Sequence, residues 1–289
     1  MKYTCHSEYG AIKTIILKRA EAAFIDDHTL GQQWKPLNFL SKPQFEQSIE
    51  EYKRFESLLG VKAFHLPPGK DLSIDSIYCR DASVVTDFGV VLCNMGKDNR
   101  STEPDAERAL YESSGVKILG AITSPGTLEG GDCAWIGKNT IAVGHTYRTN
   151  EEGIRQLKEL LEPRGVEVLV AAMPHYKGPS DVFHLMSVLS PVDKDLAVVY
   201  SPLMPIPFRN ELLRRGYSFV EVPDHEFDSM GCNVLAIAPR KVVVVKGNPE
   251  TKARLEAAGC EVIEYDGQEI SVKGGGGPTC LTRPIERQA

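Results

Sequence analysis

One order of predicted elements recurs along this chain and limits what it can fold into. Two short apolar strands joined by a tight turn precede an amphipathic helix, which precedes one more apolar strand. In the clearest copy, residues 133–144 (CAWIGKNTIAVG) have hairpin character, residues 154–161 carry apolar side chains at helical spacing, and residues 166–172 (VEVLVAA) return as a strand. The pattern predicts a ββαβ module.

The same order appears in three more segments, and a fifth copy is divided between the two ends of the chain. The hairpins fall at 83–94, 184–201 and 232–247, the helices near 103–114, 207–215 and 249–258, and the returning strands at 116–122, 217–222 and 260–265. In the fifth copy, a strand at 279–286 pairs with one at 11–19, and a helix near 43–59 and a strand at 61–66 complete it. Such repeats favour a closed array without a free sheet edge. The alternative is an ordinary α/β chain in which this order is coincidental.

Length, composition and charge exclude several classes of protein. The chain of 289 residues suits one or two domains, and we expect a single domain over residues 1–289. Its formal net charge of -6 comes from 33 basic and 39 acidic residues spread along the sequence, so we expect no nucleic-acid partner. No apolar run suits a signal segment or a membrane span, which predicts a cytoplasmic protein that does not bind membranes. Seven cysteines include no CxxC pair, so neither a disulfide framework nor a zinc site is indicated.

Four segments at equivalent ends of the repeats carry polar residues or consecutive glycines. Four glycines and Pro278 precede Cys280, and a cysteine after such a loop suits a nucleophile at a site entrance. His184 stands at the start of a repeat, Glu129 opens an acidic turn (EGGD), and Asp75 and Asp81 flank the sequence SIYCR. Read singly, these are a buried cysteine after a turn, a packed core histidine, an ordinary acidic turn and a salt-bridging acid. In a closed ring, however, they converge on one axis, where a nucleophile, an acid/base and carboxylates form a shared site.

Taken together, the motifs LEGGD, FHLMS, CRD and GGGGPTC resemble the guanidine-modifying superfamily of dimethylarginine dimethylaminohydrolases, arginine deiminases and amidinotransferases. The resemblance spans the chain from Asp75 to Cys280. It implies a five-bladed, pseudo-symmetric α/β propeller of ββαβ modules, in agreement with the repeats. It also implies a hydrolase that needs no cofactor or metal and acts on a small guanidino or ureido amino acid. A monomer and a homodimer both remain open.

The resemblance also implies roles for individual residues. Cys280 matches the nucleophile, His184 the acid/base, and Glu129 the carboxylate beside the histidine. Asp81 and Asp75 match acids that contact the substrate. Arg148, in an RTN segment, matches a binder of the substrate carboxylate, and Arg100 is a second candidate for that role. The expected reaction converts Nω,Nω-dimethyl-L-arginine to L-citrulline and dimethylamine through a covalent cysteine thiouronium.

Some features depart from each subfamily. Arginine deiminases usually carry Asp two residues after the histidine, where this chain has Met186. The GGGGPTC loop, however, is more similar to that of deiminases and amidinotransferases. A deiminase, another arginine or citrulline hydrolase and an amidinotransferase therefore stay as alternatives, as does a propeller that only binds a partner. Residues 19–34 show no clear periodicity and predict either a mobile lid over the pocket or an ordinary surface loop.

Overall fold

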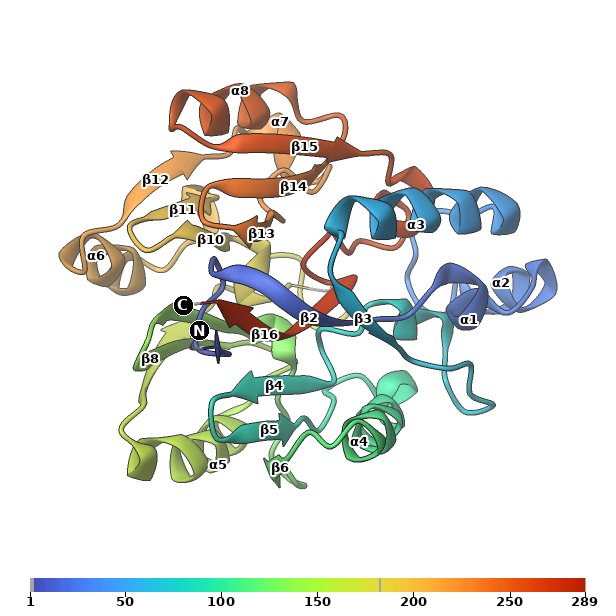
Figure 1. Ribbon diagram of the computed structural model, residues 1–289, viewed down its shortest axis with the longest axis horizontal. Coiled ribbons are helices and arrows are strands. Elements are labelled where there is room, and N and C mark those ends of the chain that lie inside the picture. Colours follow the sequence, from blue (N-terminus) through green and yellow to red (C-terminus); the bar gives the residue numbers. More distant parts are fainter. Residues whose placement is uncertain (1–2, 182, 289) are drawn as a thin grey trace.

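The ββαβ modules predicted from the sequence are present, and they form a ring of small sheets. A computed structural model describes residues 3–181 and 183–288. Within this part of the chain there are four three-stranded sheets and one of four strands, with orders β4-β5-β6, β7-β8-β9, β10-β11-β12, β13-β14-β15 and β1-β16-β2-β3. The sheets surround a common centre, and the long helices lie on the outside (Figure 1). This arrangement confirms the pseudo-symmetric propeller.

The strands of the modules agree with the predicted runs to within a few residues. They are β1 (Tyr3–Thr4), β2 (Ala11–Leu17), β3 (Lys62–His65), β4 (Ser83–Thr86), β5 (Gly89–Leu92), β6 (Ile118–Ala121), β7 (Cys133–Gly137), β8 (Thr140–His145), β9 (Glu167–Ala172), β10 (Leu189–Asp193), β11 (Leu196–Val199), β12 (Ser218–Glu221), β13 (Leu235–Ala238), β14 (Lys241–Val245), β15 (Glu261–Tyr265) and β16 (Thr282–Gln288).

The helices include one crossover helix in each module. They are α1 (Ala20–Phe24), α2 (Asp27–Gln33), α3 (Phe45–Leu59), α4 (Glu103–Ser113), α5 (Glu151–Leu161), α6 (Ile206–Arg214), α7 (Asp224–Phe227), α8 (Pro249–Ala257) and a π-helix at Gln268–Val272. Single 3₁₀ turns occur at Ile74–Ile77, Asp98–Arg100, Gly130–Asp132, Glu162–Arg164, Leu185–Ser187 and Ser201–Leu203.

Strand pairing follows one rule in every module. The first two strands pair antiparallel, as in Cys133 opposite Val143, because a tight turn joins them. The third strand pairs parallel to the second, as β8 does with β9, since a helix carries the chain back across the sheet. In the divided module, β16 pairs antiparallel with β2, with Thr282 opposite Leu17. The two ends of the chain therefore close the ring.

Crossover helix α5 is amphipathic and packs its apolar face onto strands of its own module and of the preceding one. In α5, the Asn150 side chain caps the first turn by accepting from the backbone N–H of Gly153 at 2.8 Å. The buried Leu157 and Leu161 of this helix pack in one cluster with Ile141 and Val143 of β8. Burying each leucine contributes about 1.5–3 kcal/mol. These contacts hold the module rigid and fix the position of the loops that enter it.

Residues 19–34 differ from the irregular segment expected from the sequence, because they form helices α1 and α2. These helices have five and seven residues, which is too short for a helical periodicity to stand out in the sequence. Phe24 and Leu30 are fully buried in the core that also contains Tyr52 and Phe55 of α3. The segment therefore anchors a module.

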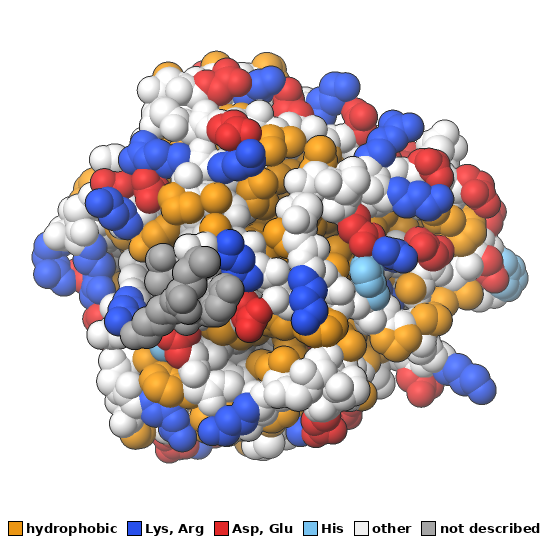
Figure 2. All heavy atoms as spheres, in the orientation of Figure 1, with side chains coloured by type: hydrophobic (Ala, Val, Ile, Leu, Met, Phe, Trp, Pro, Cys, Tyr) orange, Lys and Arg blue, Asp and Glu red, His pale blue; other side chains and the backbone are white. Residues whose placement is uncertain are grey.

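Charged side chains are mixed on the surface. On the face shown in Figure 2, Lys and Arg side chains lie among Asp and Glu side chains, with hydrophobic side chains between them. The mixture agrees with the nearly balanced charge of the whole sequence. Within residues 3–181 and 183–288, the helices are all too short or too polar to span a membrane.

Candidate active site

The entries to the five modules each place a polar side chain near the centre of the ring. Asp81 lies just before β4, Glu129 before β7 and His184 before β10, while Cys280 lies just before β16. Before β13, the equivalent position is occupied by Asn233. The predicted convergence of far-apart segments on one axis is therefore present. His184 itself precedes a 3₁₀ turn and not, as expected, the first residues of a strand.

Cys280 and His184 line one cavity, with a volume of about 260 Å³. Its wall also contains Asn233, Gly131 and apolar side chains, among them Phe183, Met186, Phe227 and Met230. Its rim includes Asn38 and Leu40, which follow α2, and Lys177 and Asp228, which pair with each other at 3.2 Å. The size suits a single small molecule.

His184 is held between carboxylates. Its Nε2 lies 2.7 Å from Oε2 of Glu129, and its Nδ1 lies 3.8 Å from Oδ1 of Asp81. Asp132 accepts a hydrogen bond from the backbone N–H of Leu185 at 2.9 Å, which fixes the backbone next to the histidine. Gly131 packs against this group so closely that a Cβ there would lie 2.4 Å from Nδ1 of His184. Only glycine fits at that position.

The buried charges shift the ionisation of the pair. Burial lowers the pKa of His184, but the charges of Asp81, Asp132 and Glu129 outweigh it and raise the pKa to about 9. For Glu129 the directions are opposite. Burial raises the pKa of its carboxyl group, but the hydrogen bond and charge of His184, together with the charge of Arg148, outweigh burial and lower this pKa. At neutral pH the imidazole is therefore protonated and the carboxylate ionised, so His184 is ready to donate a proton.

Cys280 is positioned by hydrogen bonds from two sides. Its sulfur accepts from Nδ2 of Asn233 at 3.2 Å, and Oδ1 of Asn233 accepts from the backbone N–H of Thr279 at 3.0 Å. On the other side, the backbone N–H of Arg80 donates to the carbonyl of Cys280 at 3.2 Å, and Nε of Arg80 donates to the carbonyl of Thr279 at 3.0 Å. The sulfur of Cys280 is thus held at a fixed place in the wall.

The environment of Cys280 favours the neutral thiol. Burial and the charge of Asp81 raise the pKa of the thiol, against the hydrogen bonds from Asn233 and Thr279 and the charge of Arg80. A cation bound next to Asp81 would reverse the contribution of that acid. The site is therefore built so that a positively charged ligand favours the thiolate.

Asn233 is the site residue that sequence reasoning missed. It is buried and contacts both Cys280 and Thr279. In the sequence, Cys232 and Asn233 precede an apolar run, which is what an ordinary strand start looks like. Neither residue is charged, and no run of glycines marks the segment. Its place at the entry of a module, equivalent to Asp81 and His184, is the one sequence feature that points to it.

The remaining predicted residues, Arg100, Arg148 and Asp75, do not line the cavity of Cys280. Arg100 is buried and donates to Asp81 at 2.6 Å and to Glu103, while Arg148 approaches Glu129 at 3.3 Å. Asp75 is buried and pairs with Lys97 at 2.5 Å. Arg148 also lines a neighbouring pocket of about 290 Å³, which shares Asp181 and Phe183 with the cavity of Cys280.

The acids and the histidine also form a cluster of potential metal ligands. One ligand atom from each of Asp81, Glu129 and His184 lies within 4.8 Å of the others, a spacing that suits a metal ion. Each of these groups, however, already has an internal partner, namely Arg100 for Asp81, Arg148 for Glu129 and Glu129 for His184. Oδ1 of Asp81 is buried and lacks a hydrogen-bond partner among the described residues. An oxygen left open in this way suits an N–H donor of a flat organic cation.

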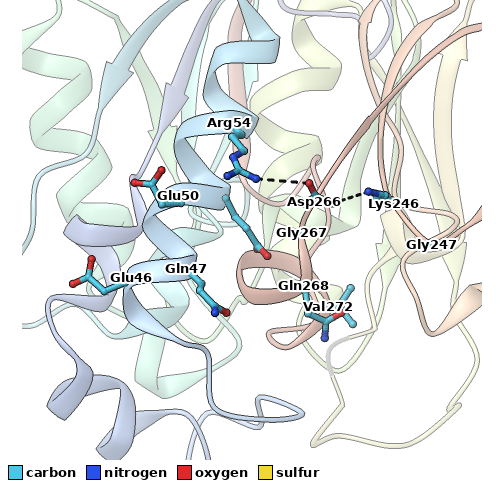
Figure 3. A pocket seen from close by; sticks show the side chains of 11 residues that line it. Glu46, Gln47, Glu50, Arg54, Lys246, Gly247, Asp266, Gly267, Gln268 and Val272 are labelled. Carbon is cyan, nitrogen blue, oxygen red and sulfur yellow. Dashed lines mark hydrogen bonds and ion pairs between the residues drawn. The ribbon is translucent and has the colours of Figure 1, made fainter.

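A larger hollow lies on the surface elsewhere, between α3 and the loops that follow β14 and β15. Its volume is about 650 Å³ (Figure 3). Glu46, Gln47, Glu50 and Arg54 lie on the α3 side. Asp266, on the other side, pairs with Lys246 at 3.2 Å and reaches across to Arg54 at 4.0 Å. Its lining among the described residues has neither a cysteine nor a histidine. We therefore assign the chemistry to the smaller cavity.

Comparison with known sequences agrees with this assignment. The family described as "N,N dimethylarginine dimethylhydrolase, eukaryotic" matches residues 42–287. The chain belongs to this family. It is 25% identical to the N(G),N(G)-dimethylarginine dimethylaminohydrolase of Pseudomonas aeruginosa, over 84% of this chain and 90% of that protein. It is 27% identical to the uncharacterised protein YkgA of Bacillus subtilis, over 99% of this chain and 96% of that one.

Solved structures show the same fold. The dimethylarginine dimethylaminohydrolase of Pseudomonas aeruginosa, a mutant in complex with citrulline, superposes with a TM-score of 0.77 at 23% identity, over 94% of this chain and 98% of that one. The chain is thus a hydrolase of this family that acts on C–N bonds of guanidino compounds. The expected superfamily, fold and class of enzyme are confirmed.

Proposed function

We propose that this enzyme hydrolyses Nω,Nω-dimethyl-L-arginine to L-citrulline and dimethylamine, with Cys280 as the nucleophile. The observation that carries the proposal is the meeting of Cys280 and His184 in one cavity, with buried carboxylates beside the histidine. Asp81 and Glu129 supply negative charge for a guanidinium, which is flat, cationic and in need of paired acceptors when it is buried.

In this proposal the substrate activates the nucleophile. The cation of the substrate offsets the charge of Asp81, which otherwise raises the pKa of the Cys280 thiol. The thiol releases its proton to solvent water, and the thiolate attacks the central guanidinium carbon. His184, protonated at neutral pH, donates its proton to the dimethylamino nitrogen as the C–N bond breaks. Dimethylamine leaves and a thiouronium remains on Cys280.

The second half of the reaction uses the same groups in the reverse sense. The neutral imidazole of His184 takes a proton from water, and the resulting hydroxide adds to the thiouronium carbon. As the C–S bond breaks, the hydroxyl proton passes to the departing sulfur, so that the carbonyl of citrulline forms and the Cys280 thiol is restored. Glu129 holds the imidazole in place and stabilises its protonated form through both steps.

The apolar part of the wall favours a methylated nitrogen. Met186 and Phe183 are buried and line the cavity, and between them they offer an N–H group only the weak acceptor of a thioether sulfur. An unsubstituted guanidinium nitrogen facing them leaves N–H groups unpaired, which costs about 1–3 kcal/mol. A dimethylated nitrogen has no N–H there and buries its methyl groups, at about 0.8 kcal/mol for each carbon. Dimethylarginine therefore fits better than arginine.

The substrate carboxylate needs a cation at the far end of the site. We assign this role to Arg148, which lines the neighbouring pocket that shares Asp181 and Phe183 with the catalytic cavity. We assign Asp75 and Arg100 to supporting ion pairs outside the cavity wall. Arg100 pairs with Asp81, and Asp75 pairs with Lys97.

A product screen tests the proposal. The protein is incubated with dimethylarginine, arginine, agmatine and citrulline, and dimethylamine, ammonia and citrulline are measured. Dimethylamine and citrulline from dimethylarginine support the proposal. Ammonia from arginine as the main product would identify a deiminase, and ammonia from citrulline would identify a ureido hydrolase. Transfer of an amidino group to an added amine would identify an amidinotransferase. Cys260→Ser is the matched control for the variant Cys280→Ser, because Cys260 lies apart from the cavity, before β15.

A further inference from the structure

Three arginines are buried around a second, very small cavity next to β16. Arg80, Arg283 and Arg287 line it, and their side chains are almost completely inaccessible to solvent. The free volume is about 10 Å³, which is room for one species of about the size of a water molecule. Nothing in the proposed catalytic mechanism uses this cavity.

The positive charge around this cavity exceeds the negative charge. Glu8 pairs with Arg80 at 3.0 Å, and within the described part of the chain neither Arg283 nor Arg287 forms an ion pair. Glu286, the other acid in the lining, is exposed and accepts from the Thr14 hydroxyl at 2.5 Å. Among the residues that line the cavity, three arginines face two glutamates, so one positive charge has no counter-charge in the lining. Buried charges in proteins are normally paired, because an isolated one is expensive to desolvate.

Two of the guanidinium groups also have donors to spare. Nη1 of Arg287 donates to the carbonyls of Gly10 and Ala236 at 2.6 and 2.8 Å, but Nη2 is buried and lacks a partner among the described residues. Nε of Arg283 is likewise buried and lacks a hydrogen-bond partner among the described residues. Burial lowers the pKa of Arg287 to about 10, and the charges of Arg80 and Arg283 add to this against that of Glu8. The group therefore remains charged at neutral pH.

We propose that this cavity, lined by Arg80, Arg283 and Arg287, binds one small monovalent anion of the chloride class. A water molecule would satisfy the spare donors but would leave the excess charge. A larger anion such as sulfate does not fit the free volume. Through Arg80, which contacts both Thr279 and Cys280, the anion site adjoins the loop that carries the nucleophile.

The solution test compares chloride with gluconate at constant ionic strength, using the full chain. We expect the melting temperature to rise saturably as chloride replaces gluconate, by about 3 °C at millimolar half-saturation. Bromide should act like chloride, and sulfate should not. Arg287→Met should lose the chloride effect. Arg108→Met, a change at an exposed arginine of α4, should keep it.

A second measurement requires no variant, in case Arg287→Met fails to fold. Crystals of the unmodified protein grown in bromide should show an anomalous scattering peak between Arg283 and Arg287. An empty or water-filled cavity would overturn the proposal, and so would equal melting temperatures in chloride and gluconate. A bromide peak without any shift in solution would identify an adventitious ion only, and would also overturn it.

Discussion

The cavity at Cys280 adjoins the start of β16 and the cavity at Arg287 lies along the same strand, yet the charges near them are opposite. Asp81, Glu129 and Asp132 lie behind His184 in the wall of the first, whereas three arginines line the second. In the first, resident arginines offset part of the negative charge, since Arg100 pairs with Asp81 and Arg148 with Glu129. One open carboxylate oxygen remains there, and two open guanidinium donors remain in the second cavity.

Under the two proposals, one ring serves two ligands of opposite sign. Module entries bring the acids and Cys280 together near the centre, and β16 supplies Arg283 and Arg287 to the second cavity. Arg80 and Asp81 are adjacent in the sequence and contribute to different cavities, although Arg80 also contacts the backbone of Thr279 and Cys280. Changes in the acidic cavity should therefore act mainly on catalysis, and changes in the basic cavity mainly on stability.

Replacing the nucleophile should have the largest effect. We expect Cys280→Ser to lower kcat for dimethylarginine by at least about 10⁴-fold, because a serine hydroxyl is far harder to deprotonate than the thiol. Steady-state release of dimethylamine measures it. Mass spectrometry of the unmodified enzyme quenched during turnover should show an adduct on Cys280. Full activity in Cys280→Ser would remove Cys280 from the mechanism.

Removing the partner of the histidine should come next. We expect Glu129→Gln to lower kcat by about 10²–10³-fold, since it takes away the charge that stabilises the protonated imidazole. In the unmodified enzyme, activity should fall as pH rises through the raised pKa of His184, near 9. In Glu129→Gln the same decline should occur at lower pH.

The same pair predicts how stability changes with pH. The pKa of His184 is raised on folding, so its contribution to stability is complete below the ordinary value of about 6.5 and is lost as pH rises towards 9. Glu167→Gln, at an exposed acid of β9, is the control, and its pH profile should match that of the unmodified enzyme. An identical profile in Glu129→Gln would contradict the role of Glu129.

The carboxylate-binding arginine should affect substrate binding more than turnover. We expect Arg148→Ala to raise KM for dimethylarginine by about 10²-fold, the equivalent of one charge-assisted pair of about 2–3 kcal/mol. The decarboxylated analogue of dimethylarginine should be processed equally by both enzymes, because it lacks the group that Arg148 binds. A fall in kcat for both substrates would show that Arg148 acts through its contact with Glu129.

The smallest expected effect concerns specificity. Met186→Asp should raise the ratio of kcat/KM for arginine to that for dimethylarginine by about tenfold. The new carboxylate accepts a hydrogen bond from an unsubstituted nitrogen, whereas methyl groups are buried less favourably against a carboxylate than against a thioether. Met186→Leu keeps an apolar side chain and should leave the ratio near its original value. An unchanged ratio in Met186→Asp would place the reacting nitrogen away from this wall.

Much of the fold was predictable because each module is encoded locally. Apolar alternation, tight turns and helical spacing are short-range signals, so the strands at 133–144 and the helix ending at Leu161 lie where the sequence predicted them. The two short helices between residues 20 and 33 were missed, since the burial of Phe24 and Leu30 depends on contacts with distant parts of the chain.

For the site, the sequence by itself determined which chemical groups were available. It placed Cys280, His184, Glu129 and Asp81 at module entries, and the resemblance to a family supplied their expected roles. The tertiary structure alone decided what each group contacts. His184 and Glu129 are 55 positions apart in the sequence, and Asn233 and Cys280 are 47 apart. No local pattern encodes such pairings, because they depend on how five modules pack around one axis. The unpaired charge of Arg287 likewise exists only once the ring has closed.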